Sequence, residues 1–308
     1  MENNRILRML AVILLISCGI VSVSLFRMLH NMNYIPSEAV DNLVEIMAKD
    51  GILLDRGIVS EKREHRTVYL FDSDDYNRTV AELLGGAAVK DVYAIPKGEL
   101  LILENGNRCE FTQNFSFRYQ TKETEEVPPD IVDLQYSGTP LTEEMAETTV
   151  AAVRNFLGNG SRAFSGGGEL RGAVEIDGIW EKAGIEYVLC SRTIDGVTIT
   201  GNLVLCTVEN GIVTAAHGTW CFFTEGTSYS AQLTDLLNIL FNVKKHLTPA
   251  DGEIIVESIH SCYSLYFFGE EENFCLIPCW QITTDIRGDL IYNAIDGTLY
   301  TKIQEQKP

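Results

Sequence analysis

Four turn signals divide much of this sequence into short strands and so limit the folds open to it. Asn105-Gly106, Ala183-Gly184, Asp195-Gly196 and Asn210-Gly211 each separate two apolar segments. Such dipeptides favour tight hairpin turns, because glycine and asparagine tolerate the left-handed backbone that these turns need. The segments between them are therefore predicted to form antiparallel strands connected by short turns, as in a meander sheet.

Helical segments alternate with these predicted strands. Apolar residues recur at helical spacing in 38–49, 142–157 and 230–246. In residues 141–308 the resulting order is helix, meander, helix, meander, which suggests two similar halves. The sequence therefore predicts an α+β protein in which helices pack on antiparallel meander sheets.

The chain is long enough for two domains of ordinary size. Residues 30–120 are predicted to form a small α+β domain, and residues 141–308 a larger one. Between them, residues 121–140 contain an acidic run followed by Pro128-Pro129, and this composition indicates a linker.

The N-terminal segment is apolar enough to cross a membrane. No formal charge occurs from Met9 to Phe26, and a helix extended to Leu29 would be about 30 Å long, the thickness of a bilayer core. Arg5 and Arg8 precede this run, which predicts a cytoplasmic N-terminus over residues 1–8 and an extracellular C-terminal portion. The sequence therefore predicts a single-pass protein of the cell membrane, anchored in the lipid bilayer by residues 9–29.

Two other interpretations of this segment stay open. Cys18 follows Leu15-Ile16-Ser17 as a lipid-modified cysteine follows a lipobox, and the whole run resembles a cleaved signal peptide. The run continues with apolar residues beyond Cys18, whereas a signal peptide ends in small residues at its cleavage site. Within a retained helix, small residues permit close approach of another helix. These candidate helix-contact residues are Ser17, Gly19, Ser22 and Ser24.

The formal net charge of −19 argues against one class of partner. Residues 1–30 hold three arginines and one glutamate, so the whole acidic excess lies in the remainder of the chain. Such a chain repels phosphate backbones, which makes nucleic-acid binding an unfavourable interpretation.

Seven of the eight cysteines lie beyond the apolar segment, at irregular spacing. An odd number in a large domain does not indicate a disulfide framework. One pair is a candidate disulfide, because a hairpin turning at 269–273 would place Cys262 opposite Cys279. Buried thiols are the alternative for both residues.

No catalytic motif is present. The chain lacks a Gly-x-Ser-x-Gly elbow and a Walker loop, and its histidines do not follow metal-ligand spacing. His217 and Cys221 lie four residues apart on a predicted strand, so they would share a face and allow a thiolate–imidazole pair. The aromatic residues beside Cys221 favour ordinary sheet packing instead. No catalytic, cofactor-binding or metal-binding residue is therefore predicted, and no cofactor.

A family resemblance rests on the C-terminal sequence. The stretch "IEYVLCSRTIDGVTITGNLVLCTVENGIVTAAHGTW" is followed by "LTDLLNILFNVKKHL" and then by "CLIPCWQITTDIRGDLIYNAIDGTLY". The last piece resembles PepSY-type modules, with Trp280 on one strand and the Tyr-x-x-Ala-x-x-Gly pattern from Tyr292 on the next. Trp280 and Tyr292 would pack on one sheet face, and Asp296-Gly297 would form the final turn.

Together with an N-terminal span, the layout resembles the YycI/YycH group of membrane-anchored regulators in Gram-positive bacteria. This resemblance implies a PepSY-like or YycI-like fold and a non-enzymatic role as a regulator of a cell-wall-sensing, two-component histidine kinase. The implied partners are that membrane kinase and a related YycH-type protein, contacted through the helix and the extracytoplasmic domain. The alternative is an extracytoplasmic binding protein or inhibitor of a cell-wall hydrolase or protease.

Overall fold

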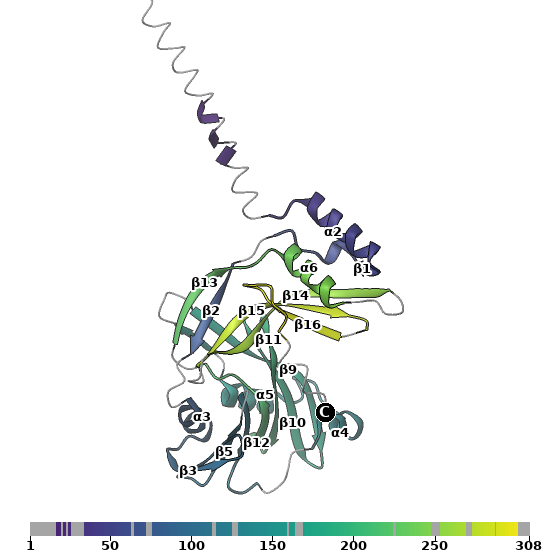
Figure 1. The fold of residues 1–308 in the computed structure, drawn as a ribbon. Coiled ribbons are helices and arrows are strands. Elements are labelled where there is room, and N and C mark those ends of the chain that lie inside the picture. The colour runs from purple at the N-terminus through teal and green to yellow at the C-terminus, as the bar shows by residue number, and fades with distance from the viewer. Residues whose placement is uncertain are drawn as a thin grey trace, which may run out of the picture. The chain divides into compact units, whose positions relative to one another are not determined.

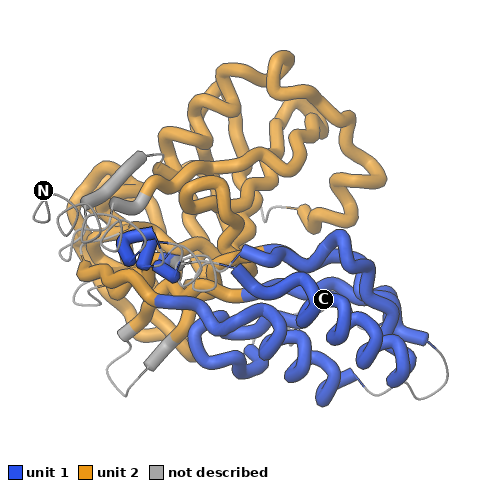
Figure 2. The backbone as a smooth tube through the Cα atoms, turned by 90° about the horizontal axis from the view of Figure 1, so that it is seen from above, with its two compact units in different colours: residues 1–66, 232–260, 280–301 blue, residues 67–231, 261–279, 302–308 orange. Residues whose placement is uncertain are grey.

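The chain forms two compact units, each assembled from separated stretches of sequence (Figure 2). Unit 1 contains the described residues within 1–66, 232–260 and 280–301, and unit 2 contains those within 67–231 and 261–279. The computed structural model describes residues 17–19, 21–22, 24–25, 34–62, 65–71, 76–112, 115–124, 129–158, 160–163, 169–223, 226–247, 253–268, 273–286 and 288–300.

In the part of unit 1 that the structure describes, two helices, drawn in Figure 1, each bury one face in a core shared with four strands. Its elements are α2 (Ser37–Lys49), β1 (Ile52–Leu54), the 3-10 helix η1 (Arg56–Ile58), α6 (Leu236–His246), β16 (Gly288–Asn293), the first part of β14 (Ile254–Phe268) and the second part of β15 (Asn273–Thr284). Helix α2 buries Val40, Leu43 and Met47, which recur every three or four residues and therefore lie on one face.

The C-terminal motif of unit 1 folds as predicted. Trp280 and Tyr292 are both buried in the unit 1 core, on strands β15 and β16. The backbone N–H of Gly297 donates to Asn293 O at 2.9 Å, and Gly297 has a φ of 76°. The final turn therefore needs a residue that tolerates left-handed backbone, which explains the glycine at this position.

Unit 2 is built around one sheet with the strand order β13-β2-β15-β14-β11-β12-β6-β5-β4-β3. Strand β11 also pairs with β10, which pairs with β9, and β9 pairs in turn with β7 and β8. The strands are β2 (His65–Phe71), β3 (Val89–Ile95), β4 (Gly98–Leu103), β5 (Arg108–Thr112), β6 (Ser116–Gln120), β7 (Thr139–Pro140), β8 (Gly160–Ala163), β9 (Glu169–Lys182), β10 (Ile185–Ile194), β11 (Val197–Glu209), β12 (Ile212–Thr219) and β13 (Gly226–Gln232).

Three helices accompany this sheet: α3 (Tyr76–Gly85), α4 (Ile131–Ser137) and α5 (Glu147–Leu157). Helices α3 and α5 contribute to the main core of unit 2, together with Val188 and Cys190 of β10. Helix α4 buries Leu134 in a smaller cluster with Tyr187 and Leu189. Because successive residues of a strand point to opposite faces, β10 is covered by apolar side chains on both sides.

The hairpins predicted from the turn signals are confirmed. Strands β9, β10, β11 and β12 pair in sequence order and antiparallel, as do β4 and β5. At the three turns of the longer run, Ala183, Asp195 and Asn210 have φ values of 56°, 49° and 53°. The dipeptides therefore adopt the left-handed backbone from which the hairpins were predicted.

The fold class predicted from the sequence is nevertheless wrong. The described strands form a large mixed sheet, in place of helices packed on antiparallel meander sheets behind a transmembrane helix. Strand β14 pairs in parallel with β1 in unit 1 and with β11 in unit 2. Parallel partners need a long connection between them, so no local turn signal in the sequence reveals the pairing.

The predicted single-pass membrane topology is also wrong. A membrane span needs about 20 helical residues, and none of the helices in the described part of the chain is both long and apolar enough. The longest helix whose bounds the structure gives, α2, has 13 residues. Within the predicted anchor over 9–29, residues 17–19, 21–22 and 24–25 are helical and exposed, and the others lie outside the described residues. The predicted localisation at the cell membrane depended on this anchor, so the same finding contradicts it.

The units also divide the chain differently from the contiguous domains expected at 30–120 and 141–308. Residues expected to form a linker contain helix α4 and strand β7, both of which belong to unit 2. Unit 1 draws its strands from both ends of the described chain, because β1 pairs with β14 across some two hundred residues.

Candidate functional site

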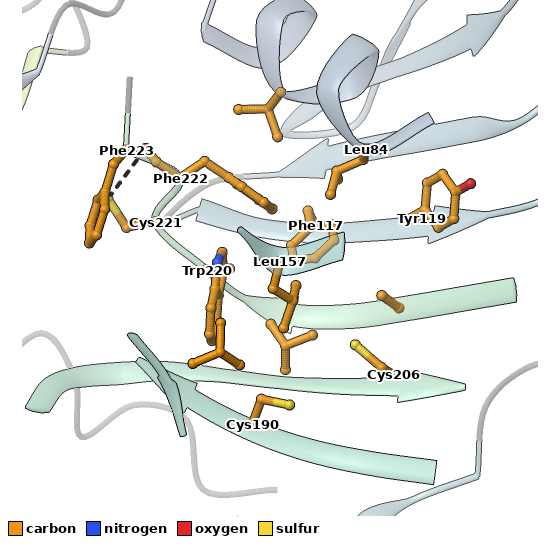
Figure 3. Close-up of a cluster of buried hydrophobic side chains, with 14 of the residues drawn as sticks. Leu84, Phe117, Tyr119, Leu157, Cys190, Cys206, Trp220, Cys221, Phe222 and Phe223 are labelled. Atoms are coloured by element: carbon orange, nitrogen blue, oxygen red, sulfur yellow. Dashed lines mark hydrogen bonds between the residues drawn. The ribbon is translucent and has the colours of Figure 1, made fainter. Parts of the chain in front are cut away.

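The thiolate–imidazole pair that the sequence allowed for His217 and Cys221, but did not favour, does not form in the structure. His217 lies on β12 and is paired across the ladders with Leu205 of β11 and Arg118 of β6. Cys221 lies beyond the end of β12, and its thiol donates to Phe222 O at 3.9 Å, the bond drawn in Figure 3. The strand ends between the two residues, so the face that they were expected to share does not extend to Cys221.

The Cys221 thiol is unsuited to nucleophilic chemistry. It is fully buried, and burial raises its pKa from 9.0 to about 12, against the smaller opposite effect of nearby Arg192. The pKa of His217 is lowered, first by burial and then by the positive charge of Arg118. At neutral pH the thiol is therefore protonated, and a thiolate is the form that attacks an electrophile.

A buried arginine is the most unusual side chain near Cys221. Arg192 of β10 is only 3% exposed, and burial lowers its pKa from 12.5 to about 10. Its Nη1 donates to Leu157 O at 3.4 Å, and its Nη2 donates to Gly158 O at 3.3 Å. These two carbonyls end helix α5, where the helix dipole is negative, so the guanidinium caps the helix.

Aromatic rings enclose the same guanidinium. Its Cζ lies 3.6 Å from the centroid of the Phe223 ring and 5.1 Å from that of Trp220. A Cβ at Gly172 would overlap the Phe223 ring and lie 3.2 Å from Arg192 Nη2, so the glycine leaves the space in which this stack fits. Asn202 joins them, because its Oδ1 accepts a hydrogen bond from the backbone N–H of Cys221. We call Arg192, Asn202, Trp220, Cys221 and Phe223 the Arg192 cluster.

Sequence reasoning missed Arg192, although a signal was present. In β10 the residues Val188, Cys190 and Ile194 all face the main core of unit 2. A period of two places Arg192 on the same face. Because Tyr187 and Leu189 make the opposite face apolar as well, the alternation is hard to see in the sequence. With Ser191 and Thr193 on either side, the arginine resembles an ordinary surface residue before the Asp195-Gly196 turn.

The remaining cysteines outside the N-terminal segment are also buried. Cys190 and Cys206 face the same core from neighbouring strands (Figure 3). A hydrogen bond with Cys206, followed by burial, raises the pKa of Cys190 well above its ordinary value. Cys262 and Cys279 are buried and no disulfide joins them in the structure. Their pairing in an oxidised form of the protein stays a prediction.

The described residues provide no ready metal centre. In that part of the chain, no group of three or more His, Cys, Asp or Glu side chains is arranged to hold a metal ion. The four candidate helix-contact residues, Ser17, Gly19, Ser22 and Ser24, are helical and exposed. Their role stays a prediction.

Strand β3 stands at one end of the strand order of unit 2. Strand β3 pairs with β4 along one side and with no other strand in the ranges that the structure describes. Val92 and Tyr93, at its middle, are 48% and 54% exposed. An edge strand presents unpaired backbone N–H and C=O groups, and an exposed apolar edge is prone to pair with another chain.

Comparison with known proteins identifies no family. No family model matches the chain, and no curated protein matches it. Among solved structures, the chain is similar to an uncharacterized protein from Eubacterium rectale ATCC 33656, determined by crystallography at 1.45 Å resolution. The two are 13% identical, the match covers 79% of this chain and 87% of the other, and the TM-score is 0.38. A similarity this distant assigns no function.

The resemblance to the YycI/YycH group gains no support from these comparisons. Its membrane anchor is contradicted by the described helices. The histidine kinase and the YycH-type protein that it implied as partners stay untested predictions.

Proposed function

We propose that this chain is a non-catalytic binding protein that recognises an extended segment of another protein through strand β3. The observation that supports the proposal most directly is the open edge of β3, with Val92 and Tyr93 exposed at its centre. Backbone groups along such an edge are satisfied by another extended strand, and side-chain positions on alternate sides give specificity.

Charge favours a basic partner over a second copy of this chain. Each copy carries a formal net charge of −19, so two copies repel one another at long range. A basic segment is attracted instead. Of the two functions considered from the sequence, a binding protein or inhibitor of a hydrolase or protease agrees best with this edge, because addition of a strand to an exposed sheet edge is a recurring way to bind an extended segment of a partner.

A peptide experiment tests the edge directly. The probe is a ten-residue peptide of alternating lysine and valine, labelled for fluorescence anisotropy and titrated with the full chain. Val92→Lys places a charge on the edge, which protects natural edge strands from pairing. We expect it to weaken binding roughly tenfold or more, the loss of about 1.4 kcal/mol of binding free energy.

Val132→Lys is the matched control. Val132 is 51% exposed, close to the value for Val92, but it lies on helix α4 and the substitution changes the charge equally. We expect this variant to bind as the wild-type chain does. A second peptide carries proline at two central positions, because proline lacks the N–H that a strand donates. The proposal is wrong if Val92→Lys and Val132→Lys bind alike, or if the proline peptide binds as well as the first.

A further inference from the structure

Arg192 carries a buried charge that no acidic group of the described residues balances. Among the described residues no carboxylate forms an ion pair with it, and its Nε has no hydrogen-bond partner. Helix carbonyls and the Phe223 ring stabilise the guanidinium in part. A guanidinium nevertheless stays charged at neutral pH, and a buried charge normally has an ionic partner.

Two further buried donors of the Arg192 cluster lack an acceptor in the part of the chain that the structure describes. Asn202 is 2% exposed and Trp220 is 1% exposed, and neither Asn202 Nδ2 nor Trp220 Nε1 has a hydrogen-bond partner. The other polar atom of the asparagine is used, because Asn202 Oδ1 accepts from the backbone N–H of Cys221 at 2.7 Å. Buried donors are almost always satisfied in folded proteins, so unsatisfied donors gathered around one charge require an explanation.

The fold brings these donors together. Ser191 of β10 is paired with Leu203 of β11, and the register then shifts before Thr193. Because the two strands are antiparallel, Arg192, which follows Ser191, and Asn202, which precedes Leu203, lie on the same side of this residue pair. Both side chains are buried. The Trp220 ring lies against the guanidinium of Arg192. The next residue, Cys221, donates its backbone N–H to Asn202 Oδ1. The three donors therefore belong to one continuous cluster within unit 2.

We propose that the Arg192 cluster is a binding site for a small oxyanion of the carboxylate or phosphate class. Such an anion supplies the missing negative charge and several acceptor oxygens for Arg192 Nε, Asn202 Nδ2 and Trp220 Nε1. Charge-assisted hydrogen bonds from a guanidinium to these groups are among the stronger ones in proteins. The site is independent of strand β3, and its failure would leave the proposed function unchanged.

The first experiment measures thermal unfolding of the full chain with sodium formate, sodium phosphate or sodium chloride at constant ionic strength. Binding to the folded state raises the midpoint in a saturable manner. We expect saturation with formate or with phosphate, which distinguishes the two oxyanion sources, and none with chloride. Equal effects of all three salts, or none at all, would show that no oxyanion site exists.

Substitutions then locate the site. Trp220→Phe removes one donor and retains a ring, and we expect it to weaken the anion affinity about tenfold, as for the loss of one hydrogen bond to a charged group. Trp280→Phe is the matched control, because Trp280 is also buried, in unit 1, and its Nε1 likewise has no hydrogen-bond partner among the described residues. An equal loss of affinity in both variants overturns the proposal.

Asn202→Asp gives a result that a structural role alone does not predict. The new carboxylate keeps an acceptor for the Cys221 N–H and replaces the unsatisfied donor with a negative charge beside Arg192. We expect this variant to be more stable than the wild-type chain in chloride and to lose its response to formate and phosphate. If it is less stable and still responds to the oxyanion, the assignment of the site is wrong.

Discussion

Two arginines of this molecule occupy opposite environments. Arg56 of unit 1 lies at the surface, where its Nε donates to Asp41 Oδ1 at 3.0 Å and its Nη2 pairs with Glu61. Hydrogen bonds with Glu61 and then Asp41 raise the pKa of Arg56. Arg192 of unit 2 is buried with carbonyls and aromatic rings for neighbours, and burial lowers its pKa. Among the described residues, acidic partners therefore surround the exposed Arg56, whose charge water already stabilises, and none pairs with the buried Arg192.

This difference shows that the number of ion pairs is a poor measure of how much an arginine contributes to the stability of the fold. Exposed pairs gain little, because water and salt screen them and ordering the long side chains costs entropy. A buried guanidinium is instead held by its packing, and any change in the side chains around it alters a close-packed core. The substitutions below are therefore expected to have large effects around Arg192 and small effects around Arg56.

The largest effect is expected from Trp220→Ala. Trp220 is among the largest fully buried side chains, and its ring lies against the Arg192 guanidinium. Its removal leaves a cavity and should lower the free energy of unfolding by about 3–5 kcal/mol. Urea denaturation measures the change. Tyr136→Ala, at a side chain that is 87% exposed, should stay within about 0.5 kcal/mol of the wild-type value. If Trp220→Ala and Tyr136→Ala lowered the free energy of unfolding by similar amounts, the expected difference between buried and exposed side chains would be wrong.

Gly172→Ala should have the next largest effect. The new Cβ would overlap the Phe223 ring and crowd Arg192 Nη2, so we expect a loss of about 1–3 kcal/mol from overpacking. Gly57→Ala provides the comparison beside Arg56, because its nearest neighbour would be Asp55 Oδ1 at an ordinary 3.4 Å. Equilibrium unfolding of both variants measures the difference, and a more destabilising change at Gly57 would reverse the comparison.

A smaller effect concerns pH. The lowered pKa of His217 means that the folded state binds a proton less readily than the unfolded chain, whose histidine has its ordinary pKa of 6.5. The associated stability is present above pH 6.5 and is lost as the pH falls through the lowered folded pKa. His217→Gln should therefore flatten the decline of stability below pH 6.5. Thermal unfolding at several pH values measures this, with exposed His260→Gln as the control. A steeper decline in His217→Gln would contradict the assigned direction.

The smallest effect is expected from Arg56→Ala. The side chains of Arg56, Asp41 and Glu61 are all substantially exposed, so the loss of both pairs should leave the unfolding midpoint unchanged within error. The measurement is thermal unfolding at low and high salt. A clear destabilisation that vanishes at high salt would show that surface pairing matters more in unit 1 than the comparison implies.

Local features of the fold were predictable from the sequence, and distant pairings were not. The turns at Asp195-Gly196 and Asn210-Gly211 set the hairpins, since each dipeptide adopts the backbone that a tight turn requires. The spacing of Val40, Leu43 and Met47 likewise indicated helix α2. The parallel pairing of Ile52 with Ile254 depends on residues far apart in sequence, and no local pattern encodes it.

The Arg192 cluster was beyond sequence reasoning for a related reason. Strand alternation places Arg192 toward the core, but its neighbours Phe223 and Gly172 come from other parts of unit 2. An arginine without a nearby acid in sequence resembles a solvated side chain. The edge of β3 was similarly hidden, because the order of the strands in the sheet decides which strand lies at its edge, and no local pattern encodes that order.

The divided sequence of unit 1 has a consequence for synthesis of the chain. Helix α2 and strand β1 leave the ribosome early, but their partners on α6, β14 and β16 follow only after nearly all of unit 2. At common elongation rates the wait is roughly 10 to 50 s. Throughout that time the apolar face of α2 has no core to join. A molecular chaperone acting on the nascent chain would therefore find its binding segment between Val40 and Leu54, while the later residues of unit 2 are already folding.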